Sequence, residues 1–531
     1  MKKLIALGLA VPMAFLMACS SDDHSVSAPD DDATVSSSSE FTEEDLDKLL
    51  AGSSSSEKTS GDKSSSSVKT SEDKSSSSVK ESSADSKSSS SVKESSADSK
   101  SSSSEKTSED KSSSSVTAAK SCDDVLDETG KMALDLVNDK SAKLFETFAD
   151  KDMDAARALA AEVKPMYKKI LDKYPEACGA QVGYAFATIG DLGNSKELRL
   201  IWDDYYNDSF RKGVSDVSEF VDIVTRLSGE KSFTQRVQDA LTAEVLPAVD
   251  SSIKLLQNVV AHKDYALRIN DGETVREMDM SEFGLALGGL FAVKAAVAIA
   301  TSMNLEVSYE GGYSWMNHVE DLRLNDEPLS RSQTKSVKAI VSLIGAKGTF
   351  TTIIKGKEDL WKSVPDLIDS AITEARASFL YSLDEVDKKG SQEFDIYVVG
   401  DGYDADVSED DVEEIIDALE TALEVTRGPY EVKIQGEKLV FDARKYFENT
   451  KGIEAFLPYY EFTDESDFST FHFTDADGNK TADLLDFVDS GRDFIKDAEG
   501  KVVFRDPTFG GVFPEFTTQQ KLWDFLKAID D

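Results

Sequence analysis

A long serine-rich stretch most strongly limits what this chain can fold into. From Ser20 to about Ala119, near-repeats follow one another, such as KSSSSVKTSED from Lys63 and KSSSSVKESSADS from Lys74. They have no hydrophobic periodicity and almost no large apolar residue, so burial cannot offset the backbone entropy that is lost on ordering. We therefore predict a disordered tether over residues 19–119 and a folded part that follows it.

The negative charge of the chain belongs mainly to this folded part. The 531 residues carry a net charge of −42, and the 13 basic and 21 acidic residues up to Ala119 leave −34 for the remainder. Such a surface repels nucleic acid and anionic lipid headgroups, and it suits solubility, cation binding or basic partners. We therefore expect no nucleic-acid partner. The length is typical of two to four units of ordinary domain size.

The N-terminus has the pattern of a signal peptide. A short basic start, MKK, is followed by the apolar run Leu4–Met17, which is too short to span a bilayer comfortably. The run ends in LMAC, which resembles the lipobox of bacterial lipoproteins. The resemblance implies that residues 1–18 are removed and that Cys19 receives a diacylglycerol, with a further acyl chain such as palmitate on its amine. Two or three chains make membrane anchoring stable.

The residues after Cys19 bear on the location of the protein. Position two is Ser20, not Asp. By resemblance to the lipoproteins of diderm bacteria, this favours the outer membrane over retention in the inner membrane. The acidic run SDD is similar to the tag of some surface-exposed lipoproteins, and serine-rich spacers behind lipoboxes resemble those of surface proteins in some fibre-degrading bacteria. The membrane is then a partner through the N-terminal lipid.

One island, EFTEEDLDKLLAG, interrupts the tether. It predicts a short helix over residues 42–51, with Thr42 and Asp45 as a capping box and Phe41 and Leu46 as a hydrophobic staple. Three leucines share one face. Two interpretations stay open: a helix that docks on a partner, or a transient turn of helix without a partner.

Residues 120–390 are predicted to form a helical domain. Apolar residues recur at spacings of three and four, namely Ala156, Leu159, Val163, Met166, Tyr167 and Ile170. The sequence YPE from Tyr174 then ends the helix, and a second helix rich in small residues follows. The segment from about Lys140 to Asn194 resembles a tetratricopeptide repeat. This resemblance implies a divergent helical array that offers a groove to a peptide or another protein.

The most apolar segment of the mature chain is Phe283–Met303. Lys294 lies at its middle, and the small residues Gly284, Gly288 and Gly289 suit close helix packing. A lone lysine at the midplane of a bilayer is costly. We therefore predict a central buried helix rather than a membrane span.

Residues 391–531 are predicted to form an α+β region that packs on the helical domain. A helix begins after Ser408 and ends before Gly428, and two β-prone runs flank Gly436 as a hairpin. The terminal helix has Thr517 and Gln520 as its predicted capping box. The fold class is therefore mainly α, with short β-hairpins in the C-terminal part. As a whole the folded part resembles large tetratricopeptide-like lipoproteins of unassigned function in diderm bacteria.

The strongest candidate for a metal site is the acidic loop DADGNKTADLLD. Calcium loops place oxygen ligands at positions one, three, five, seven, nine and twelve. The side chains at five of these positions belong to Asp475, Asp477, Asn479, Asp483 and Asp486. However, Lys480 stands where a glycine is wanted, and no pair of helices flanks the loop. The alternative is a turn rich in Asp, Gly and Asn, which favour turns for their own backbone reasons.

Cys122 and Cys178 are the cysteines that remain after Cys19. An exported compartment permits a disulfide between them, and the alternative is two free thiols. No Gly-x-Ser-x-Gly, His-x-x-x-His or phosphate-binding Gly-Lys-Ser/Thr sequence is present, so no catalytic residue is assigned.

These observations favour a lipid-anchored, non-enzymatic binding or scaffolding module on a long flexible tether. Its expected partner is a protein or peptide in a helical groove, and no cofactor is required. Two alternatives stay open. One is a hydrolase of envelope or extracellular polymers, and the other is an adhesion module that depends on calcium.

Overall fold

The computed structural model describes part of the chain, in a series of segments. The described residues are 41–52, 122–149, 153–207, 227–228, 231–270, 275–305, 323–324, 327–328, 330, 349–386, 398–400, 407–463, 468–483 and 500–529. Every described residue belongs to one unit, which comprises residues 1–52 and 121–531. The serine-rich repeats thus lie outside the described residues.

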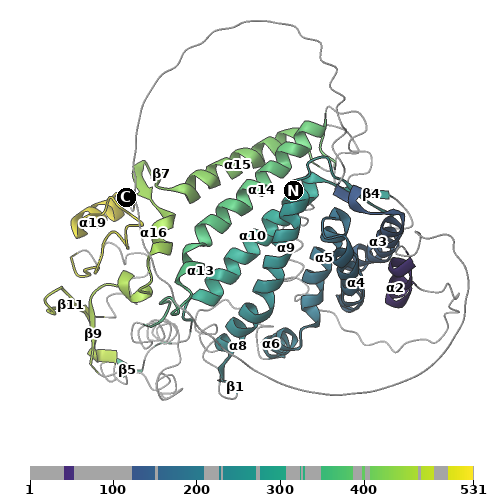
Figure 1. The fold of residues 1–531 in the computed structure, drawn as a ribbon. Coiled ribbons are helices and arrows are strands. Elements are labelled where there is room, and N and C mark those ends of the chain that lie inside the picture. Colours follow the sequence, from purple (N-terminus) through teal and green to yellow (C-terminus); the bar gives the residue numbers. More distant parts are fainter. Residues whose placement is uncertain are drawn as a thin grey trace, which may run out of the picture. The chain divides into compact units, whose positions relative to one another are not determined.

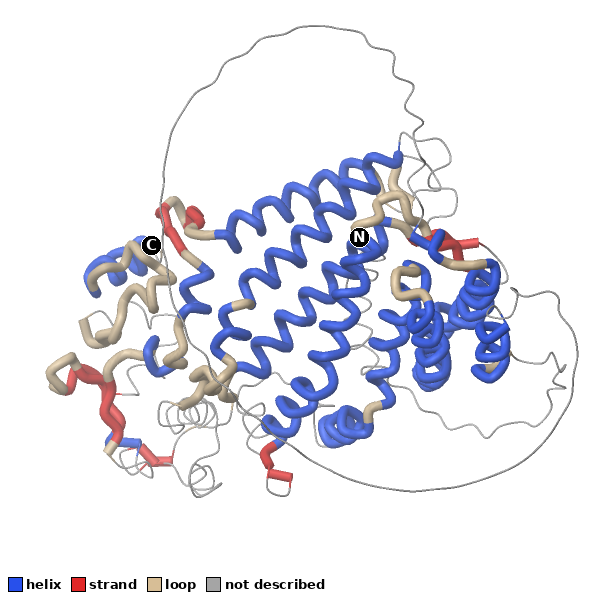
Figure 2. Tube along the Cα trace, viewed as in Figure 1, coloured by secondary structure: helices blue, strands red, loops and turns tan. Residues whose placement is uncertain are grey.

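Most of the described residues are helical (Figure 2). The α-helices are α2 (Glu43–Gly52), α3 (Glu128–Ala149), α4 (Met153–Lys173), α5 (Cys178–Asp191), α6 (Lys196–Asn207), α8 (Phe233–Ala240), α9 (Leu246–Val260), α10 (Met280–Ser302), α13 (Glu358–Lys362), α14 (Val364–Val386), α15 (Glu409–Arg427), α16 (Ala443–Glu448) and α19 (Gln519–Ala528). A π-helical turn, η4 (Leu241–Val245), joins α8 to α9, and short 3-10 turns are η1 (Cys122–Val125), η2 (Leu192–Asn194), η6 (Ile453–Phe456) and η7 (Phe468–Thr470).

The long helices pack one against the next in a single succession. The order of neighbours is α3, α4, α5, α9, α10, α14 and α15, as Figure 1 shows. The largest buried cluster joins α5, α9 and α10, and smaller ones lie between α3 and α4 and between α14 and α15. Because α15 packs against α14, the succession of helices continues to Arg427.

The central helix of this succession is α10. It is long and apolar enough to cross a membrane, but 61% of its most hydrophobic window is buried inside the protein. A Cβ atom on Gly288 would lie 2.8 Å from the carbonyl oxygen of Ala371, which is why α14 can approach so closely. Lys294 reaches Asp250 of α9, with Nζ 2.7 Å from the carboxylate. The segment therefore lies in the core, as its small residues and its lysine predict.

The strands form short antiparallel sets. Within the described segments, four are two-stranded: β1 (Leu227–Ser228) with β2 (Lys231–Ser232), β3 (Leu267–Asn270) with β4 (Val275–Met278), β5 (Arg323–Leu324) with β6 (Glu327–Pro328), and β7 (Tyr430–Ile434) with β8 (Glu437–Phe441). The fifth has the order β11-β10-β9, from Lys480–Asp483, Phe471–Thr474 and Tyr460–Phe462.

The sequence predicted short hairpins in the C-terminal part, but hairpins also occur earlier in the chain. Three of the pairs precede residue 390. Between β3 and β4 the sequence is DGET, preceded by Asn270, and an Asn-Asp-Gly run is itself a turn signal. The hairpin around Gly436 is confirmed: Gln435 and Gly436 both have positive φ, which suits a tight turn between β7 and β8.

Candidate functional site: a surface that holds a helix

The short helix α2 forms as its capping residues predict. The Thr42 amide donates to a carboxylate oxygen of Asp45 (3.2 Å), and the Asp45 amide donates to the Thr42 hydroxyl (3.4 Å). The hydrogen bonds from Thr42 lower the pKa of the Asp45 carboxyl. Because a helix of ten residues is marginal alone in water, it needs a partner to persist.

That partner is the same chain (Figure 1). The helix α2 packs against both α3 and α4, although 69 residues separate its end from Cys122. Leu46 is 0% exposed and shares a buried cluster with Val137 of α3 and Met166 of α4. Phe41, Leu49 and Leu50 are partly buried against the same cluster. The segment therefore forms a docked helix, and the surface that holds it belongs to its own chain and not to a separate partner.

Three lysines of α3 and α4 fix α2 along its length, and we call the surface that carries them the docking surface. Lys140 donates to the Phe41 carbonyl before the helix (3.1 Å), and Lys173 donates to the Leu50 carbonyl near its end (3.1 Å). Between them, Lys169 pairs with Glu43 (2.8 Å) and Asp47 (2.7 Å).

The positive charges of the docking surface match both the acidic side chains of α2 and the polarity of its helix dipole. Lys173 meets the end of the helix where the last carbonyl groups have no intrahelical partner and where the macrodipole favours a cation. Lys169 meets two acids one turn apart on α2, whose hydrogen bonds raise the pKa of its ammonium. The Lys140 side chain is only 9% exposed and also pairs with Glu162. The surface thus complements the acids of α2 and the polarity of its backbone.

A buried tyrosine keeps the helices beneath the docking surface in register. The Tyr167 hydroxyl is 2.6 Å from the Ser141 hydroxyl and donates to the Asn138 side-chain carbonyl (2.9 Å), which ties α4 to α3. Burial raises the pKa of Tyr167 far above its ordinary value, so the ring stays neutral. On its other side the ring lies against Gly183 of α5, where no side chain is in the way.

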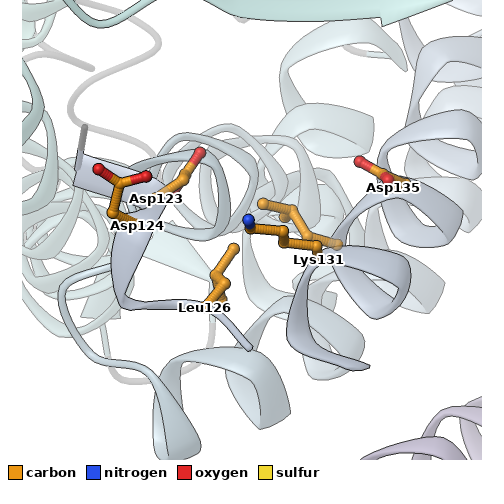
Figure 3. A pocket seen from close by; sticks show the side chains of 6 residues that line it. Asp123, Asp124, Leu126, Lys131 and Asp135 are labelled. Atoms are coloured by element: carbon orange, nitrogen blue, oxygen red, sulfur yellow. The ribbon is translucent and has the colours of Figure 1, made fainter. Parts of the chain in front are cut away.

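A second feature is an acidic hollow of about 290 Å³ beside η1 and α3. Its lining residues are Asp123, Asp124, Leu126, Lys131, Leu134 and Asp135. In Figure 3 the Lys131 side chain extends between Asp123 and Asp135. Burial raises the pKa of both of these carboxyls, and for Asp135 the charges of Asp139 and Asp123 add to the effect.

The hollow has a structural explanation. The Gly179 amide in the first turn of α5 donates to Asp123 (3.2 Å), while Ala177 at the N-cap offers no side-chain bond. Asp123 therefore satisfies an amide at the N-terminus of α5 and complements its dipole. Burial, followed by the nearby Asp123 charge, raises the pKa of Tyr265. The acid thus acts as a cap supplied by a distant part of the chain.

Cys122 and Cys178 are joined as a disulfide beside this cap, with Cα atoms 5.6 Å apart. A ring nitrogen of His262 lies within 4.8 Å of both sulfurs. Metal sites use cysteine as a thiolate, and neither sulfur of a disulfide is one. The group is therefore a bridge that fixes η1 to the start of α5, with an exposed histidine next to it.

The residues of the predicted calcium loop lie at the turn between β10 and β11. Asp475 accepts from the side-chain amide of Asn479 (2.9 Å) and from the backbone amides of Asn479 (2.8 Å) and Asp477 (2.9 Å), and these bonds within the turn lower the pKa of its carboxyl. Asp483 lies in β11 and pairs with Lys480, while Asp486 is outside the described residues. The hydrogen bonds are those of a turn, and calcium binding stays a prediction.

The chain matches no known protein family, and no curated protein or solved structure is significantly similar to it. The predicted lipidation site, Cys19, is outside the described residues. The docking surface was not predicted from the sequence. Its one visible signal is the pair Lys169 and Lys173, which face the same way on α4 at a spacing of four residues.

Proposed function

We propose that this protein is a lipid-anchored lipoprotein of the cell envelope whose helical body is a non-enzymatic binding or scaffolding module. Cys19 carries the lipid, the outer membrane is the location, and the serine-rich repeats are a flexible tether. The body is a divergent, tetratricopeptide-like array, whose partner is a protein or peptide. The LMAC sequence and the composition of residues 20–119 support the anchor and the tether.

The observation that carries the binding function is the docking of α2. An amphipathic helix laid on a surface with an apolar centre and charged edges is a recurring mode of peptide recognition. Here Leu46 supplies the buried anchor, and Lys140, Lys169 and Lys173 supply the edges. A surface that can bury one helix in this manner has the chemistry to bind helices as ligands.

The anchor is tested on the full chain purified from the membranes of its native host. Mass spectrometry of the N-terminal peptide should show that residue 19 is first and carries two or three acyl chains. The Cys19→Ser variant should be unmodified and should leave the membrane fraction. An unmodified N-terminal peptide from the wild-type chain would contradict lipid anchoring.

The binding function is tested by photo-cross-linking in intact cells. A photoreactive amino acid at Glu162, beside the docking surface, should form adducts with a defined envelope protein. The same amino acid at Glu414, on the exposed face of α15, is the matched control and should not. Equal adducts at both positions, or none at Glu162, would argue against a binding role for this surface.

A further inference from the structure

We propose that the docking surface of α3 and α4 is a binding site for an acidic amphipathic helix of another protein, and that α2 is its internal competitor. This inference deepens the binding function proposed above and does not depend on the lipid anchor. It rests on three properties of the α2 contact: its chemistry, its small size and its covalent connection.

The chemistry defines the class of ligand. The contact needs a large apolar residue where Leu46 stands, because that side chain is fully buried. It needs acids one turn apart where Glu43 and Asp47 meet Lys169. It also needs a helix end near Lys173, which bonds to the Leu50 carbonyl. A basic or purely apolar helix fails on the second requirement, since it leaves Lys169 without its acids.

The small size makes α2 replaceable. It has ten residues and only one fully buried side chain, and its exposed acids pair with lysines in partly solvated positions. Exposed ion pairs stabilise a contact only weakly, and the entropy of folding a short helix opposes the docking. A longer helix with a second buried residue gains apolar contact that α2 does not offer.

The covalent connection explains why α2 nevertheless occupies the surface, and why the competing partner is not a second copy of this chain. As the flexible tether proposed above, the 69 residues of segment 53–121 hold α2 near the docking surface at an effective concentration on the order of 1 mM. An identical α2 from another molecule binds no more tightly, and it lacks this advantage. Only a helix of a different protein, with a better-matched face, displaces the tethered one.

The test uses a labelled synthetic peptide with the sequence of residues 40–52 and full-length chains in which α2 is disabled. Leu46→Asp places a charge in the buried position, and Lys48→Pro breaks the helix without touching the docking surface. Circular dichroism of both variants checks that the body is folded. Fluorescence anisotropy then measures binding of the peptide.

We expect saturable binding to both disabled chains, and at least about tenfold weaker apparent binding to the wild-type chain, in which α2 competes. The same peptide with Leu46→Asp should not bind. Wild-type protein should sediment as a monomer at micromolar concentration, and a dimer that exchanges α2 would refute the choice of partner.

A charge reversal tests the role of Lys169. In a disabled chain, Lys169→Glu should weaken binding of the natural peptide and restore binding of a peptide with Glu43→Lys and Asp47→Lys. Lys168→Glu is the matched control, because Lys168 pairs with Asp172 on its own helix. Two results overturn the proposal: no saturable binding to either disabled chain when both are folded, or binding that ignores Lys169 and the buried leucine. Neither result affects the mass-spectrometric test of the anchor.

Discussion

The contact between Gly183 and Tyr167 gives the sharpest prediction of stability. A Cβ atom on Gly183 would lie 2.6 Å from Cε2 of Tyr167 and closer still to two other ring atoms. Real Cβ contacts are longer than 3.0 Å, so the ring must move in the Gly183→Ala variant. It has little freedom to do so, because it is 2% exposed and its hydroxyl is bonded to Ser141 and Asn138.

The size of the effect follows from three contributions. Overpacking of a buried ring costs about 1–3 kcal/mol. Weakening two buried hydrogen bonds costs about 0.5–1.5 kcal/mol each. Replacing glycine by alanine inside a helix returns about 1 kcal/mol. We therefore expect Gly183→Ala to lower the free energy of unfolding by about 1–5 kcal/mol, with a central value near 3 kcal/mol.

The assay is urea unfolding of the full chain, followed by circular dichroism and compared between matched variants. In Gly190→Ala the new Cβ meets only the Ala160 methyl group, at 2.9 Å, so the free energy of unfolding should fall by less than in Gly183→Ala. In a Tyr167→Ala background the clash is gone, so Gly183→Ala should be neutral or stabilising there. The reasoning fails if Gly183→Ala matches the wild type, or if it costs the same in both backgrounds.

Three further predictions concern the body. Burial raises the pKa of Asp123, so the folded chain keeps that proton to a higher pH than the unfolded chain. The free energy of unfolding therefore falls as the pH rises from the ordinary Asp pKa to the raised one. At pH 7 Asp123→Asn should unfold at a higher urea concentration than the wild type, and below the ordinary Asp pKa the two should unfold at the same concentration. The Cys122–Cys178 bridge closes a loop across 56 positions, so reduction should cost about 4 kcal/mol in urea unfolding, and reductant should not affect the double Ala variant. Gly288→Ala should lower the free energy of unfolding by about 1–3 kcal/mol, because the new Cβ forces α14 away from α10. Gly428→Ala is the control: nothing lies within 4 Å of its Cβ, so its urea midpoint should stay near that of the wild type.

Much of the fold follows from local sequence signals. Ser408 caps α15 by accepting from the Asp411 amide, Gly428 ends that helix, and the small residues of α10 lie against α14. The two helix ends depend on residues within one turn of one another, and the small residues of α10 stand close together in the sequence, although the contact with α14 that they permit is tertiary. The order in which the helices pack does not follow from local signals, because many amphipathic helices present equivalent apolar faces.

The cap of the last helix shows where local signals stop being sufficient. The sequence favoured Thr517, but Thr518 is the residue whose hydroxyl accepts from the Lys521 amide. The two threonines are chemically equal. The Gln519 side chain accepts from the backbone N–H of Phe504 and donates to its carbonyl oxygen. This tertiary contact fixes which residue begins α19.

Of the candidate site, the helix α2 could be predicted from the sequence, but the surface on which it docks could not. The capping box of α2 and its leucine face are local, and both are visible in the sequence. Its position on α3 and α4 depends on Lys140, Lys169 and Lys173, which are about 90 to 130 residues away along the chain. No periodicity connects residues at that separation, and the serine-rich repeats between them suggested that the segment was isolated.

The docking of α2 changes which segment of the chain transmits tension between Cys19 and the helical body. For a chain held at Cys19, a pull on the body passes through the 22 residues that end at Glu40 and then through α2, so the body stays within about 75 Å of the anchor. When α2 detaches, the same pull runs through 103 residues and the limit becomes about 350 Å. For a chain anchored at Cys19, the docking of α2 through its buried Leu46 thus sets the upper limit of this distance.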